Sequence, residues 1–427
     1  MSPTFASLSI RNYRIYFFGG LLSNTGTWMG RVAQDWLVLV ELTNHDATAL
    51  GIVTALQFLP VVLLAPIAGA LADRFKKRRV LAVTQSGLAV TSAILAVLTL
   101  TGAVTLWQVY VLALLQGMFT AADNPTRQAF VSEMVPPERL GNAVGLGSAS
   151  FNAARLIGPG VAGLLIAMVG TGWTLVVNTF SFVAVLGALW LMQGSELRPA
   201  PRGKGKGGIR EGLAYVKHRP DLQLIMVLVF VLGTFGMNFQ ITTALMATTV
   251  FGKGATEFGL LGSIMAIGSL SAALMSARRS EPRLRVLLMA LAGFVVASAG
   301  AATAPTYTLF ALWLIPVGLM ALTVLPTANT MVQLSVAPHM RGRVMALYMA
   351  VFMGGTPIGA PLIGWIGDEW GARWTIGIGS VATGIAVVAA TMYIMRSDDL
   401  RIRYRFHERP HLQVRRNDES VTPERVA

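Results

Sequence analysis

Apolar runs long enough to cross a membrane recur along nearly the whole chain, and they restrict its fold more than any other feature. A helix needs about 20 apolar residues to span the hydrocarbon core of a bilayer. Backbone amides inside that core must be hydrogen-bonded within the protein, so each run predicts a helix. Only 13% of the residues are charged, compared with roughly 25% in soluble domains. The sequence predicts twelve membrane helices, over residues 15–40, 50–72, 80–101, 105–124, 142–168, 172–193, 222–249, 258–277, 284–303, 307–329, 344–366 and 373–395.

The basic residues lie almost entirely on one side of the predicted membrane. The chain has 34 Lys and Arg residues and a formal net charge of +14. With both termini in the cytoplasm, 30 of these 34 residues are cytoplasmic, Arg31 and Arg155 lie within helices, and only Lys253 and Arg373 lie outside. This distribution follows the positive-inside rule. We therefore expect a multi-pass protein of the plasma or inner membrane, whose basic surface faces the lipid bilayer and does not bind nucleic acid.

The chain contains no cysteine, and its five histidines all lie outside the predicted membrane helices. These counts exclude a disulfide framework and a thiolate metal site, and they argue against a histidine proton relay. The segment 203–208 is rich in glycine and lysine, but it lacks the spacing of a nucleotide-binding loop and a preceding strand. We therefore expect no cofactor and no metal, and transport that draws on an ion gradient or on the substrate's own gradient.

An internal repeat relates the two halves of the chain. When residues 125–163 are placed over residues 326–364 without a gap, 12 of 39 positions are identical, and prolines and glycines are among them. Because six predicted helices separate equivalent positions, both halves have the same orientation in the membrane. The predicted domains are an N-terminal six-helix bundle (1–194), a basic cytoplasmic linker (195–220) with a surface helix around 209–218, a C-terminal six-helix bundle (221–396) and a disordered cytoplasmic tail (397–427).

Residues 69–79, GALADRFKKRR, connect the second and third predicted helices. Small residues such as Gly69 let two helices approach closely, and Asp73 is an acid among cations. This pattern resembles the signature loop between helices 2 and 3 of the major facilitator superfamily. Trp28, QDWLV at 34–38, PTRQAF at 125–130 and GPG at 158–160 are similar to the branch that includes the enterobactin exporter and macrolide-type drug efflux proteins.

The resemblance implies an all-α integral membrane fold, with twelve transmembrane helices in two parallel six-helix repeats and a substrate site between them. It implies a secondary active transporter that works by alternating access. We expect it to export a small amphipathic compound (a drug, a secondary metabolite or a siderophore) in exchange for protons. We expect a monomer. An inward nutrient symporter of the same fold is the alternative, because the residues do not fix the direction of transport. An integral-membrane enzyme fits less well, because carboxylates are scarce in the spans and histidines are absent from them.

Charged residues within the predicted spans are the main functional candidates, because a charge at the centre of a membrane helix costs about 2.5–3.5 kcal/mol on insertion scales. Four qualify, namely Arg31, Asp35, Asp123 and Arg155, and all belong to the N-terminal half. Asp35 is the predicted proton-coupling residue, because burial disfavours its charged form and a neighbouring arginine favours it. An ion pair with Arg31 that only neutralises both is the alternative. Asp123 is a second candidate, although an ion pair with Arg127 explains it better.

Arg155 has two interpretations, namely binding of an anionic substrate and pairing with Asp35 or Asp123. The C-terminal half is expected to supply shape and neutral hydrogen bonds. The predicted substrate-binding residues are Asn24, Trp28, Arg31, Asn152, Arg155, Asn238 and Asn329. The predicted gating residues are Gly69, Asp73, Arg74, Arg78, Gly158 and Pro159. The resemblance implies that Asp73 engages the start of helix 11, at residues 341–343, when the cytoplasmic side is closed.

Overall fold

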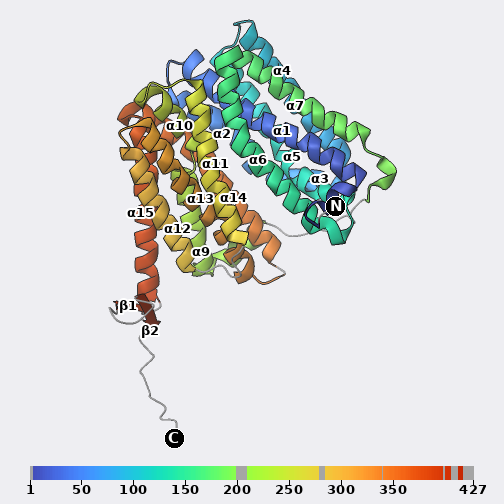
Figure 1. The fold of residues 1–427 in the computed structure, drawn as a ribbon. Helices are drawn as coiled ribbons and strands as arrows, with labels where there is room; N and C mark the ends of the chain where they lie inside the picture. The colour runs from blue at the N-terminus through green and yellow to red at the C-terminus, as the bar shows by residue number, and fades with distance from the viewer. Residues whose placement is uncertain are drawn as a thin grey trace.

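Two bundles of helices, one from each half of the chain, lie side by side in the computed structural model (Figure 1). The structure describes residues 3–198, 209–277, 284–338, 340–397, 400–404 and 412–416. Helices contain nearly all of these residues, so the predicted all-α fold is confirmed. The middle of the predicted linker, residues 199–208, lies outside the described residues.

The N-terminal bundle contains the first half of the helices. Its elements are η1 (Pro3–Ser9), α1 (Arg11–Trp36), η2 (Leu37–Leu42), α2 (Ala47–Leu63), α3 (Ala65–Arg74), α4 (Lys77–Leu100), α5 (Leu106–Met134), α6 (Pro137–Val169), α7 (Thr171–Leu191) and η3 (Gly194–Glu196). Helix α1 passes directly into the wider π-helix η2, and Leu64 separates α2 from α3. Helix α4 packs on α5 and α7, and α1 packs on α6 and α7.

The C-terminal bundle repeats this arrangement. Its elements are α8 (Ile209–Lys217), α9 (Pro220–Val231), η4 (Leu232–Gly236), α10 (Phe239–Leu245), η5 (Met246–Val250), α11 (Ala255–Ala277), α12 (Leu284–Thr303), α13 (Tyr307–Ser335), α14 (Arg341–Trp370) and α15 (Ala372–Ser397). Helix α12 packs on α13 and α15, as α4 packs on α5 and α7. The short helix α8 forms where the linker sequence indicates a surface helix, and it packs on α14.

Two short strands differ from the expectation for the C-terminal tail. Strand β1 (Leu400–Tyr404) pairs antiparallel with β2 (Leu412–Arg416), in a segment that the sequence predicts to be disordered. Their residues are rich in alternating basic and apolar side chains, a pattern with the two-residue period of a strand. The other residues beyond Ser397 lie outside the described part of the chain.

Within the described residues, nine helices are long and apolar enough to cross a membrane. Helices α1, α2 and α5 are not among them. Helices α1 and α5 carry charged residues, and α2 has only 17 residues before the break at Leu64. All twelve apolar runs of the sequence fall on helices, and the count of twelve crossings stays a prediction.

The seventh predicted helix, residues 222–249, is broken in the structure. Helix α9 widens into the π-helix η4, and Met237 and Asn238 are not helical before α10 begins. Helix α14 approaches η4 closely, and a Cβ atom on Gly355 would lie 2.8 Å from the backbone nitrogen of Thr234. Broken helices of this kind are typical of transporter binding sites near the middle of the membrane. The sequence analysis did not predict this break.

The bundles touch mainly along two pairs of helices, α2 with α14 and α6 with α11, and α10 makes smaller contacts with α1 and α2. Gly51 and Gly364 lie in the first contact, and Gly163 and Gly259 lie in the second. A Cβ atom on any of these four glycines would overlap the backbone of the opposite bundle. All four lie toward the end of the molecule that carries the connections 43–46 and 251–254, which we call the closed end. Small residues therefore permit direct backbone contact there.

Asp368, near the end of α14, adds hydrogen bonds to this contact. Its carboxylate accepts hydrogen bonds from the backbone N–H groups of Ala47 and Thr48 at 2.8 and 2.9 Å, and from the Thr48 hydroxyl. These residues begin α2, where N–H groups have no partner within the helix and the helix dipole favours a negative charge. Asp368 thus caps a helix of the opposite bundle, a role that the sequence analysis did not identify.

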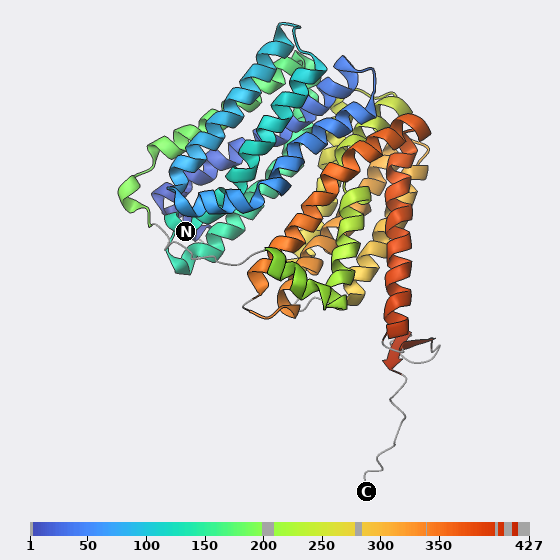
Figure 2. The same ribbon diagram turned by 180° about the vertical axis from the view of Figure 1, so that it is seen from behind.

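The bundles separate toward the other end, which we call the open end and which carries the N-terminus, the connections 75–76 and 135–136, and α8. Figure 2 shows the two bundles diverging in this direction. Among the described residues, every hydrogen bond between the bundles lies nearer the closed end. The ion pairs Lys77–Glu133 and Glu211–Arg343 at the open end each stay within one bundle.

We expect Asp368→Asn to loosen the closed end. The amide carries no charge and cannot accept with both terminal atoms, so the favourable interaction with the helix dipole, worth up to about 1 kcal/mol, is lost. This corresponds to a shift of about fivefold toward molecules open at this end. Spin labels on cysteines at Ala103 and Pro305, exposed residues of the two bundles at the closed end, would measure the change by pulsed electron resonance. Glu369→Gln removes the neighbouring exposed carboxylate and is the matched control; an unchanged distance distribution in Asp368→Asn would contradict the capping role.

Candidate substrate cavity

A cavity of about 1110 Å³ lies between the two bundles and extends toward the open end. Sites for small molecules usually have volumes of about 300–1,000 Å³. Helices α1, α2, α5 and α6 line it on one side, and the broken helix at residues 237–243, α11 and α14 line it on the other. The lining reaches from Asp35 and Thr54, on the side of the closed end, to Val131 and Val144, close to the open end.

The charged residues of the lining all come from the N-terminal bundle, as the sequence predicts. They are Arg31, Asp35, Asp123, Arg127 and Arg155. The C-terminal bundle contributes amide, hydroxyl, aromatic and thioether groups. The cavity is therefore amphipathic, and its charge lies on one wall.

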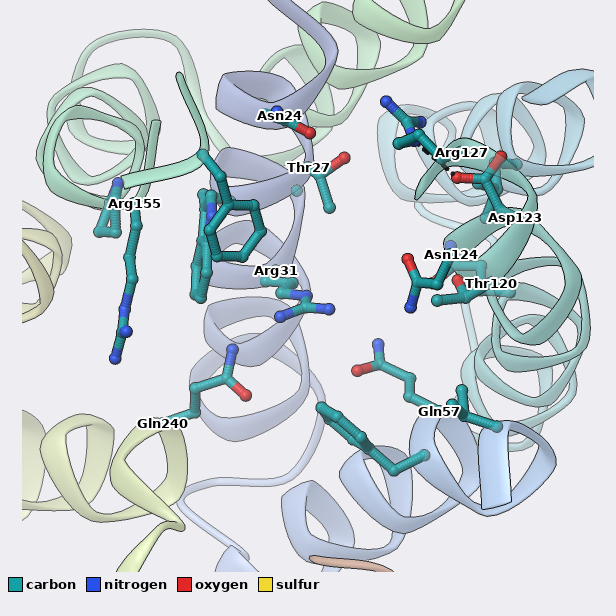
Figure 3. A pocket seen from close by; sticks show the side chains of 18 of the residues that line it. Asn24, Thr27, Arg31, Gln57, Thr120, Asp123, Asn124, Arg127, Arg155 and Gln240 are labelled. Carbon is teal, nitrogen blue, oxygen red and sulfur yellow. Dashed lines mark hydrogen bonds and ion pairs between the residues drawn. The ribbon is translucent and has the colours of Figure 1, made fainter. Parts of the chain in front are cut away.

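Asp123 has a full set of hydrogen-bond donors. The Thr84 hydroxyl and the Gln85 amide each donate to its Oδ1 atom at 2.8 Å, and Arg127 donates from Nε to Oδ2 at 3.0 Å. Figure 3 shows the Asp123–Arg127 pair together on α5. The ion pair expected from the i,i+4 spacing is therefore present, and these two charges neutralise each other.

Arg31 and Arg155 have no such partners. Neither forms a hydrogen bond or an ion pair with a residue that the structure describes. Their guanidinium carbons lie 5.1 and 5.7 Å from the centroid of the Trp28 ring. A cation–π contact stabilises by about 0.5–2 kcal/mol, which is less than the cost of about 2.5–3.5 kcal/mol for a charge in mid-membrane. The ion pair between Arg31 and Asp35, which was the alternative interpretation of these two residues, is not formed in this structure.

Asp35 lies one helical turn beyond Arg31 and is almost fully buried, with 4% of its surface exposed. Its Oδ2 atom has no hydrogen-bond partner. A buried polar atom without a partner costs about 1–3 kcal/mol or more when it is charged. Asp35 thus differs from Asp123 in the same cavity, because its environment leaves the carboxylate poorly satisfied.

The broken helix brings neutral polar groups to the opposite wall. Asn238 donates from Nδ2 to the carbonyl of Thr234 at 2.7 Å, and its Oδ1 atom is buried without a partner. Figure 3 shows Gln240 on this wall, and both Gln240 and Arg155 line the cavity. These amides agree with the expected contribution of the C-terminal half to the site.

The structure brings most of the predicted substrate-binding residues into one cavity. Asn329 is the exception, because it is absent from the lining and its side-chain oxygen accepts a hydrogen bond from Gln333 at 2.6 Å. The predicted residues that do line the cavity are Asn24, Trp28, Arg31, Asn152, Arg155 and Asn238, with both proton-coupling candidates.

The predicted gating residues occupy two regions. Gly158 packs α6 on α1, where an added Cβ atom would lie 2.6 Å from the Cβ atom of Trp28, and Pro159 lies in the α6–α11 contact. Arg74 is exposed, and Arg78 donates to the carbonyl of Trp190 at 3.3 Å.

No atom lies within 4 Å of a Cβ placed on Gly69, so the expected close helix approach is not made there in this structure. The side chain of Asp73 lies outside the described residues.

Part of the cavity wall was not predicted from the sequence. Gln57 and Gln116 line the cavity and could have been found as polar residues within apolar runs. Phe58 and Phe151 also line the cavity, and the centroid of the Phe58 ring lies 5.8 Å from the guanidinium carbon of Arg31. Nothing in the sequence separates these two phenylalanines from the many that face lipid.

Comparison with known proteins gives a consistent result. The family model described as "Transmembrane secretion effector" matches residues 2–422. The chain is 26% identical to the staphyloferrin A transporter of Staphylococcus aureus (strain NCTC 8325 / PS 47), over 92% of this chain and 99% of that protein. It is 28% identical to the multidrug efflux pump Tap of Mycolicibacterium fortuitum, over 90% of this chain and 97% of that protein.

Solved transporters share the fold. A bacterial homolog of the human lysosomal transporter Spinster, in an inward-facing and unoccupied conformation, matches with a TM-score of 0.70 and 16% identity, over 91% of this chain and 97% of that one. A D-xylose–proton symporter matches with a TM-score of 0.67 and 14% identity, over 88% and 96%. At these identities the similarity concerns the fold alone.

We expect Arg127→Gln to destabilise the protein, because it leaves the buried carboxylate of Asp123 without its counter-charge. Breaking one side of a buried pair costs about 3–5 kcal/mol. The double variant Asp123→Asn with Arg127→Gln should regain much of this loss, since neither charge remains. Thermal unfolding of the purified variants in detergent measures both effects; equal stability of Arg127→Gln and the wild type would show that the pair is not structural.

Proposed function

Because the chain belongs to the transmembrane secretion effector family of the major facilitator superfamily, we propose that it is a secondary exporter of a small amphipathic compound, such as a drug, a secondary metabolite or a siderophore. The names of its relatives include a siderophore transporter and a multidrug efflux pump. The observation that carries the proposal is the amphipathic cavity between two bundles that touch at one end only.

The open end is assigned to the cytoplasm on the basis of charge. The basic connection 74–79 and the linker helix α8 lie at this end, whereas the connections of the closed end contain few cations. Basic residues flank the cytoplasmic ends of membrane helices. In this orientation the cavity is open to the cytoplasm and loads substrate from inside the cell, as an exporter requires.

Transport then proceeds by rocking of the two bundles about the cavity. Opening of the closed end requires separation of the glycine contacts and release of Asp368 from the start of α2. Closure of the open end brings α3 toward the start of α14. Asp73 is proposed as the latch of that second state, engaging residues 341–343, where a helix N-terminus and cations favour a carboxylate. In the present state Arg343 forms an ion pair with Glu211 of α8 at 2.6 Å.

Asp35 is proposed as the residue that couples export to proton entry. It is buried, it lines the cavity and one of its oxygens has no partner. When the cavity opens to the outside, Asp35 takes up a proton, which relieves the cost of a poorly satisfied buried carboxylate. When the cavity opens to the cytoplasm, water hydrates the carboxylate and Asp35 releases the proton there. Asp123 is the second candidate, and its three donors make it the weaker one. The chain is proposed to act as a monomer, since one chain supplies both walls of the cavity.

The proposed orientation predicts the result of reporter fusions. Fusions after Gly172 and after Arg373 should report the outside, and fusions within the linker should report the cytoplasm. The physical reason is the excess of Lys and Arg in the linker and the signature loop. A cytoplasmic signal from either outer fusion would reverse the orientation and with it the direction from which the cavity loads.

We expect Asp35→Asn to abolish uphill export while preserving downhill exchange, because asparagine keeps the volume of the side chain and loses its titratable proton. Inverted membrane vesicles with an imposed pH gradient, tested with a panel of drugs and siderophores, measure the uphill rate. It should fall below about a tenth of the wild-type rate, as expected when a catalytic proton transfer is lost.

The double variant Asp123→Asn with Arg127→Gln is the matched control, because it removes a cavity carboxylate without leaving an unpaired charge, and it should keep most of the coupling. Uphill export by Asp35→Asn at the wild-type rate would refute the assignment. Substrate accumulation in the opposite direction, by the wild type, would favour an inward symporter.

A further inference from the structure

The charges of the cavity do not balance. It contains three arginines and two aspartates, and Asp123 is already paired with Arg127. The remaining charges are the two cations Arg31 and Arg155 and the single anion Asp35, which forms no ion pair with either of them within the described residues. An empty cavity therefore holds a net positive charge on its N-terminal wall.

Arg127 shows what a structural arginine looks like in this protein. It bonds to a carboxylate that is also held by two neutral donors, so every charge in that cluster is satisfied. Arg31 and Arg155 share none of these features, although they lie in the same cavity. Cations in membrane proteins that have no internal partner commonly mark the path of a substrate or an ion.

The two guanidinium groups lie around one aromatic side chain, although they come from different helices. Arg31 comes from α1 and Arg155 from α6, and both lie within 6 Å of the centroid of the same Trp28 ring. Figure 3 shows both side chains extending into the cavity. Two cations without counter-charges in one cavity repel each other, and a bound anion would offset that repulsion. Guanidinium groups also match the planar geometry of carboxylate and phosphate oxygens.

We propose that the transported compound is an organic anion whose carboxylate or phosphate groups bind to Arg31 and Arg155. Trp28 orients the two guanidinium groups, and Phe58, Phe151 and Phe352 contact the apolar body of the compound. This proposal rests on the proposed export function and adds the chemical class of the substrate. An anion that leaves a cell with a negative interior moves down the electrical gradient, which favours export.

The proposal gives Asp35 a second effect. Its negative charge lies one turn from Arg31 and competes with the substrate anion for the arginines. Removal of that charge by Asp35→Asn should therefore strengthen anion binding, although the same change abolishes coupling. The proton would then act on the return of the empty carrier and not by displacing the anion.

A pair of probes that differ only in charge tests the proposal. Dansylglycine carries a carboxylate and dansylglycinamide does not. We expect the full chain, in nanodiscs of phosphatidylcholine, to bind dansylglycine at least about tenfold more tightly, because hydrogen bonds to charged groups contribute at this level. Arg31→Gln and Arg155→Gln should each weaken dansylglycine binding about tenfold and leave dansylglycinamide unchanged. Asp35→Asn should tighten it severalfold.

Matched variants separate this effect from general damage. Arg14→Gln removes an exposed cation from the same helix as Arg31, outside the cavity, and should change nothing. Arg31→Gln and Arg155→Gln should keep the wild-type unfolding temperature, because no described carboxylate loses its partner. Equal binding of the two probes, or binding that ignores both substitutions, would overturn the proposal.

Lipid is the other source of an anionic group, and nanodiscs with phosphatidylglycerol test it. Loss of dansylglycine binding in these discs would assign the arginines to a lipid headgroup and overturn a transported anion. If energised vesicles transported neutral compounds and the protein bound dansylglycine and dansylglycinamide equally, the proposed export function would stand and only the substrate class would be refuted. Selective binding without any export would refute the proposed function and leave the anion site.

Discussion

Glycines at the closed end allow the backbones of the two bundles to touch, and the cavity exists because this contact is made at one end only. Gly51 and Gly364 join α2 to α14, and Gly163 and Gly259 join α6 to α11. In a membrane, lipid tails are as apolar as the helices, so such close packing replaces the hydrophobic effect as the source of association. Asp368 adds a cap across the same contact. From this closed end the two bundles diverge, and the amphipathic cavity between them is open at the other end.

The two walls of the cavity differ in the chemical groups that they present. The N-terminal wall holds all the charge, and the C-terminal wall offers amides and aromatic rings on a broken helix. Among the charges, Asp123 and Arg127 satisfy each other, whereas Arg31, Arg155 and Asp35 do not. The unsatisfied groups are the ones whose energy a ligand or a proton can change. This contrast within one cavity is the physical basis for the proposal that the arginines recognise the substrate and that Asp35 couples transport to protons.

The fold followed from the sequence because apolar length, positive charge and an internal repeat all gave the same answer. Charged residues in apolar runs also located the N-terminal wall, since Arg31, Asp35, Asp123 and Arg155 all line the cavity. Other features depend on contacts between segments far apart in the chain. In the sequence Asp368 looks like an ordinary exposed acid, and its role as a cap depends on the position of α2 in the fold. Asn329 looks like a binding residue in the sequence, but its side chain accepts a hydrogen bond from Gln333. The helix break at Met237 and Asn238 lies within one continuous apolar run, where the pattern of hydrophobic residues does not indicate where a helix ends.

The most direct test of alternating access about the closed end is a reversible cross-link between α6 and α11. A Cβ atom on Gly160 would lie 3.8 Å from that of Ser263, and disulfides have a mean Cβ separation of about 3.8 Å. The chain has no other cysteine, so Gly160→Cys with Ser263→Cys can form one defined bond. We predict that oxidation stops export, that binding from the cytoplasmic side persists, and that a reductant restores export in the same sample. If a fully cross-linked sample exported substrate as fast as the same sample after treatment with the reductant, the account would be contradicted.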